Sequence, residues 1–229
     1  MAQRVLWLVC GPVACGVAAG LAFASPQFAS TLAFTYSSTT PGTPSGLDSL
    51  ATFSDPGEPG GKLKELVRIR VRFHPGTRLD TTALPRCRAS DRDVRILGLR
   101  ACPASTRLGT VQGEGVISTG LRFNPIGHLF NARRAIIVVA TVAGRYTTSF
   151  RDDVTRETIT VNFRIPRGIS FTSFKPHIPR HFKKRGKRRK AYMRTPPSCP
   201  ASRTWTTNVV FIYRDGSTQE LAAATPCRR

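Results

Sequence analysis

The stretch Val67-Arg68-Ile69-Arg70-Val71-Arg72-Phe73 alternates apolar and cationic side chains without a break. Because successive side chains of a β-strand point to opposite faces, this pattern predicts a half-buried strand with one cationic face. The Gly- and Pro-rich residues 55–61 precede it and are typical of a turn. Residues 63–73 therefore predict β structure, and the rest of the chain is interpreted on that basis.

Further strands are predicted on both sides of this segment. Ile136-Ile137-Val138-Val139 is continuously apolar and predicts a central strand covered on both faces, and residues 209–213 read similarly. Asp215-Gly216 is a strong hairpin signal. Other segments with strand patterns are residues 31–36, 108–118, 135–143, 155–165 and 218–224. Many short strands predict an all-β fold, an antiparallel β-sandwich (immunoglobulin-like or jelly-roll-like) with one short helix.

The single predicted helix begins after Ser90. Its hydroxyl can cap the first turn, Asp91 and Asp93 suit the positive end of the helix dipole, and Gly98 can end the helix. Cys102-Pro103-Ala104-Ser105 is echoed at residues 199–202, and each copy precedes a predicted strand. We interpret the echo as a repeated local corner that leads into a strand.

The N-terminus predicts a leader. Arg4 precedes an apolar run from Val5 to Phe23, and Ala22-Phe23-Ala24 matches the small-residue cleavage site of a secretory signal peptide. We predict a signal peptide over residues 1–24 and a single β-sandwich domain over residues 25–229. The alternative is that the leader is retained as a membrane anchor, because 19 apolar residues approach the span of a bilayer.

Four cysteines follow the predicted leader: Cys87, Cys102, Cys199 and Cys227. An even number in an exported chain predicts two disulfides, and the spacings are too wide for the paired knuckles of a structural zinc site. Four cysteines allow three pairings. We favour Cys87 with Cys102 and Cys199 with Cys227, since each pair brackets one local segment, and the other two pairings stay open.

The formal net charge of +22 favours an anionic partner. A basic loop at about residues 175–194 holds ten basic residues and no acidic one. Its core predicts a polyanion-binding site made of Lys183, Lys184, Arg185, Lys187, Arg188, Arg189 and Lys190. The alternative is a solvated loop between two strands that binds nothing. Phe171, Phe174, Phe182 and Tyr192 lie around this segment and are expected to face inward.

No motif predicts a catalytic residue, a metal site or a cofactor. His177 and His181 have the spacing of two metal ligands on a helix, but Pro176 and Pro179 argue against a helix there. Asp152 and Asp153 follow Arg151 and are interpreted as a polar turn. These two carboxylates are also the candidates for an alternative function, hydrolysis of an envelope glycan or ester.

A set of phrases gives a resemblance that covers residues 47–227. It consists of residues 75–80, 83–91, 102–109, 194–200 and 205–208, with the cysteines and their Pro neighbours in order. The chain resembles a group of exported proteins from high-GC Gram-positive soil bacteria for which no activity is known. The resemblance implies export and the disulfide framework, and it adds no catalytic residue. The dense Lys and Arg core of the basic loop departs from that group.

The sequence therefore predicts an exported, non-enzymatic protein that associates with anionic cell-envelope polymers or a membrane surface through its basic side chains. No sequence-specific recognition of nucleic acid is expected. Besides the hydrolase, the other alternative is a structural or assembly subunit that pairs its exposed strand edges with a partner chain.

Overall fold

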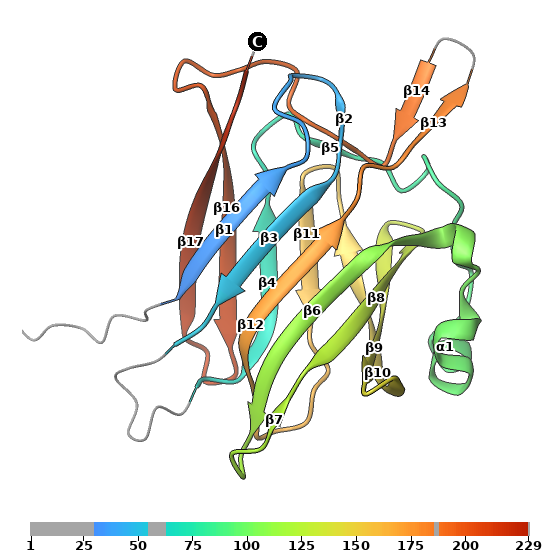
Figure 1. The fold of residues 1–229 in the computed structure, drawn as a ribbon, viewed down its shortest axis with the longest axis vertical. Coiled ribbons are helices and arrows are strands. Elements are labelled where there is room, and N and C mark those ends of the chain that lie inside the picture. Colours follow the sequence, from blue (N-terminus) through green and yellow to red (C-terminus); the bar gives the residue numbers. More distant parts are fainter. Residues whose placement is uncertain (1–29, 55–62, 186–187, 229) are drawn as a thin grey trace, which may run out of the picture.

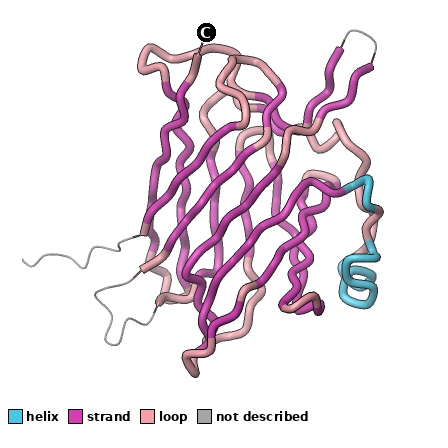
Figure 2. Tube along the Cα trace, in the orientation of Figure 1, coloured by secondary structure: helices cyan, strands magenta, loops and turns pink. Residues whose placement is uncertain are grey.

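The computed structural model describes residues 30–54, 63–185 and 188–228. The predicted leader, residues 1–24, lies outside the described residues. Most of the described chain forms antiparallel strands, with one short α-helix on the outside of the sheet (Figures 1 and 2), so the predicted all-β class is confirmed.

One large sheet dominates the structure, and every neighbouring pair in it is antiparallel. In spatial order its strands are β1 (Thr31–Tyr36), β3 (Leu47–Thr52), β12 (Ile169–Ile178), β6 (Arg107–Ile117), β8 (Pro125–Ala132), β9 (Ala135–Val142), β10 (Arg145–Val154), β11 (Thr158–Asn162), β4 (Leu66–Arg72), β16 (Thr204–Tyr213) and β17 (Thr218–Pro226). The short strand β7 (Arg122–Phe123) pairs with β6.

This sheet bends round until its two outer strands meet. β1 lies beside β17, and the Thr225 hydroxyl donates a hydrogen bond of 2.9 Å to the Phe34 carbonyl oxygen. Figure 1 shows the two strands side by side in the ribbon. The two packed sheets of the predicted sandwich are thus opposite walls of one nearly closed sheet. The core lies against the inner face of this sheet. β1 and β17 lie against each other as the two ends of the strand order, and no backbone ladder joins them in the described residues.

Burial follows the predicted alternation in β4. Ile69 is buried and Val71 half-buried, whereas Arg68, Arg70 and Arg72 are exposed. All four residues from Ile136 to Val139 are buried in β9, as the continuous apolar run predicts. In β16 the similar run over residues 209–213 is covered on one face only, because Val210 and Ile212 are half-exposed.

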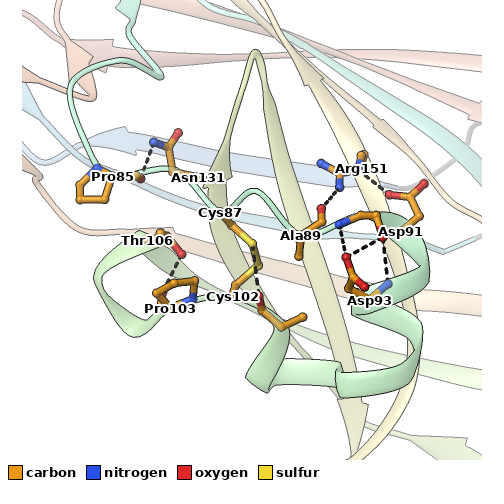
Figure 3. The surroundings of a disulfide bond; sticks show 12 residues. Pro85, Cys87, Ala89, Asp91, Asp93, Cys102, Pro103, Thr106, Asn131 and Arg151 are labelled. Carbon is orange, nitrogen blue, oxygen red and sulfur yellow. Dashed lines mark hydrogen bonds and ion pairs between the residues drawn. A yellow bond between two sulfur atoms is a disulfide. The ribbon is translucent and has the colours of Figure 1, made fainter.

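The outer face of β9 is covered by the disulfide-closed helical loop. Helix α1 (Asp91–Leu97) begins at the Ser90 cap and ends at Gly98, as predicted, and the short helices η2 (Gly98–Ala101) and η3 (Ala104–Thr106) follow. Val94 and the Cys87–Cys102 disulfide pack with Ile137 and Val139. Figure 3 shows the Arg151 side chain, from β10, hydrogen-bonded to Ala89 and Asp91 of this loop. The loop is therefore fixed to the sheet by both apolar and ionic contacts.

The second disulfide joins Cys199 to Cys227, with 5.7 Å between the Cα atoms, so the structure has the favoured pairing. The two Cys-Pro corners also share one backbone hydrogen bond. The Thr106 N–H donates to the Pro103 carbonyl oxygen, and the Arg203 N–H donates to the Pro200 carbonyl oxygen. Each corner is one hydrogen-bonded turn that leads into a long strand, β6 or β16, as the repeated motif predicts.

Two small sheets complete the fold. One contains β2 (Pro44–Ser45), β15 (Met193–Arg194) and β5 (Arg78–Leu79), and it buries Met193 in the core. The other is a hairpin of β13 (Phe182–Arg185) and β14 (Arg188–Ala191). The predicted basic loop is therefore wrong as a loop: its first residues continue β12, and its core is this hairpin. Lys is depleted in strands and the segment lacks an apolar alternation, so the sequence pattern did not indicate the hairpin.

Candidate functional site

The hairpin of β13 and β14, called here the basic hairpin, projects away from the body of the protein (Figure 1). Its register places Lys183 opposite Lys190, and both side chains are exposed. The backbone register continues with Lys184 opposite Arg189 and Arg185 opposite Arg188. Lys187, the remaining predicted binding residue, lies outside the described residues. The structure thus brings the six described residues of the predicted set together on one two-stranded element.

This register is electrostatically unfavourable for the isolated protein. Like charges directly opposite each other on paired strands destabilise the pairing. Neither Lys183 nor Lys190 forms an ion pair with a described residue. An anionic partner would remove this repulsion, so the basic hairpin has the electrostatic properties of a site for anions.

The base of the basic hairpin is firmly attached to the core. The Tyr192 N–H donates to the His181 carbonyl oxygen, and the His181 ring Nε2 lies 2.7 Å from the Leu108 carbonyl oxygen. Tyr192 is fully buried, whereas Phe182 is exposed and lies under the Arg180 guanidinium. Of the four aromatic residues expected to face inward, Phe182 is the exception, because the strand that carries it leaves the core.

The two histidines considered as metal ligands have separate partners. His177 lies in β12, where its ring Nδ1 is 2.6 Å from the Asp48 carboxylate, while His181 contacts Leu108. His181 lies beyond the end of β12, so the two histidines share neither a helix nor a strand. The structure does not bring the two imidazoles to one site.

A second cationic feature lies on the outer face of β4. Arg68, Arg70 and Arg72, called here the arginine row, are exposed at every second position. Their register neighbours on β11 and β16 are uncharged residues, among them Asn162, whose side-chain oxygen accepts a hydrogen bond from the Arg68 Nε. Alternate residues of a strand are about 6.6 Å apart, so the row presents evenly spaced guanidinium groups.

Inside the large sheet lies a cavity of about 180 Å³. Its walls come from ten strands and are almost wholly apolar, with Asp152 as the one charged lining residue. Asp152 is 3% exposed and lies within β10, so its interpretation as part of a polar turn is wrong. The alternation of β10 carries it to the inner face with Phe150 and Val154, while Asp153 faces solvent.

The Asp152 carboxyl has an unusual environment. The main-chain N–H of Asn162 donates to it, but its Oδ1 has no hydrogen-bond partner among the described residues. Burial raises the pKa of Asp152 well above its ordinary value, and the nearby Asp153 raises it further. The Tyr192 hydroxyl is also buried without a partner among the described residues. Burial raises the pKa of this hydroxyl, and the nearby Asp152 raises it further.

The two candidate acids of the hydrolase alternative do not share a site. Asp152 lines the cavity and Asp153 is exposed on the opposite face of β10. A pair of catalytic carboxylates must flank one scissile bond. This arrangement does not supply such a pair from these two residues.

Comparison with known proteins gives no relative: no family model, curated protein or solved structure matches this chain. Two disulfides are compatible with an exported protein, since such bridges persist in oxidising compartments. Across residues 30–54, 63–185 and 188–228, no helix has the length and apolar character needed to cross a membrane.

Proposed function

We propose that the protein is exported and associates, without catalysing a reaction, with an anionic polymer of the cell envelope. The observation that carries this proposal is the register of the basic hairpin, which places cationic residues opposite one another on an element that projects into solvent. Repulsion between these residues lowers the stability of the free hairpin. An anion that binds between their side chains removes the repulsion.

The partner is expected to carry repeated phosphate or carboxylate groups. Lys supplies a compact charge for such groups, and Arg can bind them through two parallel hydrogen bonds. Binding of this kind releases counterions, so affinity falls steeply as salt increases.

The test is co-sedimentation of the oxidised, leader-free protein with purified cell-wall sacculi over a salt series. The variant Lys183→Gln/Lys184→Gln/Lys190→Gln removes three charges from the basic hairpin. The matched control, Arg68→Gln/Arg70→Gln/Arg72→Gln, removes the same charge from the arginine row. We expect the slope of log affinity against log salt to fall by about 2 to 3 for the hairpin variant and by less for the control.

Two results would contradict the proposal. If wild-type protein binds sacculi equally well in low salt and in about 1 M salt, where screening is complete within a few ångströms, charge does not drive the association. If the two triple variants lose the same affinity, net charge matters and the basic hairpin is not the site.

An anionic membrane surface is the second candidate partner, and the helical loop favours it. Ile96, Leu97 and Leu99 are 67%, 47% and 38% exposed, and Arg95 and Arg100 flank them. Apolar side chains beside cationic ones are typical of segments that lie in the headgroup region. Sedimentation with anionic and zwitterionic vesicles tests this candidate. Ile96→Ser/Leu97→Ser would weaken vesicle binding about tenfold and leave sacculus binding unchanged.

A further inference from the structure

The register brings small residues together along one part of the cavity wall inside the large sheet. Gly127 of β8 is paired with Val111 of β6 and with Ala140 of β9, and Gly113 lies two residues further along β6. All four residues line the cavity. Three neighbouring strands thus lack large side chains at one level of the sheet, and the opposite wall does not fill the space.

The cavity also separates two parts of the core. One cluster surrounds Trp205 and Phe73, and the other surrounds Phe174 and Phe211. Four cavity-lining residues, Leu32, Val71, Val111 and Val161, pack against both clusters and yet remain partly exposed. Their accessible surface is apolar, and covering it with an apolar ligand would be favourable by about 25 cal/mol per Å².

Asp152 gives this apolar space a single strongly polar point. A carboxyl group that loses water without gaining full hydrogen bonding costs the fold free energy, whereas Leu or Val in its place would cost none. Its Oδ1 has no partner among the described residues, although the side chain lines the cavity and is almost completely buried. An acceptor held in this way is available to a molecule that enters the cavity.

We propose that the cavity is a binding site for a small apolar molecule that carries one hydrogen-bond donor, with the apolar part among the core side chains and the donor on the Asp152 carboxyl. The volume of about 180 Å³ sets the size of the buried part. A cavity of about 150 Å³ in another protein binds benzene. The ligand class is therefore a single ring, or a short alkyl chain, with one hydroxyl or amine group.

This proposal is independent of the binding of envelope polymers, because it concerns the inside of the large sheet and uses none of the residues of the basic hairpin. The two proposals can fail separately. A protein that binds sacculi but no apolar probe would retain the first proposal and lose the second.

The experiment uses two probes that differ in one group: benzyl alcohol, which carries a donor, and toluene, which does not. Binding to the leader-free, oxidised protein is followed by titration of methyl NMR signals, including those of Val111 and Val161. We expect saturable shifts of these methyl signals with both probes. Benzyl alcohol should bind about tenfold more tightly, which corresponds to one hydrogen bond in an apolar site.

Three variants separate the contributions. Asp152→Leu removes the acceptor and is expected to abolish the preference for benzyl alcohol while toluene still binds. Asp153→Leu makes the same change on the outward face of β10 and is the matched control, so the preference should be unchanged. Val161→Phe fills the space and is expected to weaken both probes by tenfold or more.

Several outcomes would overturn the proposal. They are the absence of saturable shifts with either probe, equal affinity of wild-type protein for the two probes, or a preference that survives in Asp152→Leu. Should Asp152→Leu fail to fold, the comparison of the two probes on wild-type protein and on Val161→Phe still decides the matter.

Discussion

The basic hairpin and the cavity both hold ionisable side chains without an opposite charge beside them, but they do so in opposite surroundings. On the hairpin, Lys183 and Lys190 face each other in water. In the cavity, Asp152 lies among apolar side chains. Two unit charges 4 Å apart in water interact by about 1 kcal/mol, whereas a carboxylate taken out of water costs several. An unpaired charge therefore costs little free energy on the basic hairpin and much more in the cavity.

The pKa values of two aspartates express this difference in surroundings. At the exposed β16–β17 turn, hydrogen bonds from the Ser217 side chain and Lys64, with the Ser217 N–H, lower the pKa of Asp215 to about 2. At the cavity, burial raises the pKa of Asp152. One carboxylate is stabilised by its neighbours and the other is destabilised by the lack of them. Uncompensated charge in this protein thus identifies two places where a partner from outside the chain would be favourable.

The largest expected effect comes from adding a second acid to the cavity. Val138→Asp places a carboxyl on the inner face of β9, where Val138 is 2% exposed and lines the cavity. Burial of an unpaired charge should lower the free energy of unfolding by about 3–5 kcal/mol at neutral pH. Urea denaturation followed by circular dichroism measures the change.

Val138→Thr is the matched control, since threonine has nearly the shape of valine and no charge. It should cost about 1–2 kcal/mol. If Val138→Asp is no less stable than Val138→Thr, the interior solvates charge well and the contrast between the two regions does not hold.

The next effect is a gain in stability on removing the ionisable group at Asp152. Asp152→Asn keeps an oxygen that accepts from the Asn162 N–H and cannot ionise. We expect the free energy of unfolding at neutral pH to rise by about 1–3 kcal/mol, or the Tm by about 2–10 °C. Differential scanning calorimetry at several pH values measures both the size and the pH dependence of the gain.

The sign of that pH dependence follows from the raised pKa. The folded state holds the Asp152 proton more tightly than the unfolded state, so its contribution is present below the ordinary value of 3.8 and is lost as pH rises through the folded pKa. Asp152→Asn should thus gain more at pH 7 than at pH 4. Asp215→Asn is the control of opposite sign, because the contribution of Asp215 is lost as pH falls from 3.8 towards 2. A gain from Asp152→Asn that is independent of pH would show that the carboxyl does not ionise differently in the two states.

Local patterns in the sequence predicted much of the fold. The alternation of β4, the Ser90 cap of α1 and the Asp215-Gly216 turn each depend on a few consecutive residues. Pairing between distant strands left no such signal: β12 lies between β3 and β6, and β1 meets β17 at the far end of the chain. The closure of the sheet depends on these contacts, and so it could not be predicted from local patterns.

For the candidate sites, too, local patterns in the sequence predicted some features, while others depend on pairing between distant strands. Charge density drew attention to the cationic residues of the basic hairpin, but it did not predict their strand pairing. For the cavity, Gly113, Gly127 and Ala140 become neighbours only through the register of three strands. Asp152 did leave one signal in the sequence. Phe150 and Val154 stand two residues to either side of it, which places the carboxyl on the apolar face of a strand. The adjacent Arg151 and Asp153 favoured the interpretation as a turn.

The smallest expected effect concerns the basic hairpin. Lys190→Glu converts the pair with Lys183 from repulsive to attractive, which should stabilise the hairpin by about 0.2–1 kcal/mol. Because the gain is local, amide hydrogen exchange in β13 and β14 is the suitable measurement, and protection should rise by about 1.4- to 5-fold at low salt. High salt should remove most of the gain.

Lys175→Glu is the matched control, since Lys175 is equally exposed and its register partner on β6 is the uncharged Gln112. It changes the net charge by the same amount and should leave exchange in the hairpin unaltered. Equal protection in the two variants would mean that the net charge of the protein, and not the facing lysines, sets the stability of the hairpin. A third outcome links stability to binding. If only Lys190→Glu raises exchange protection in the hairpin, and if it also weakens binding to sacculi more than Lys175→Glu does, the facing lysines lower stability and contribute to binding at the same position. The Asp152 carboxyl in the cavity is the buried case of the same arrangement, an ionisable group held without an opposite charge beside it.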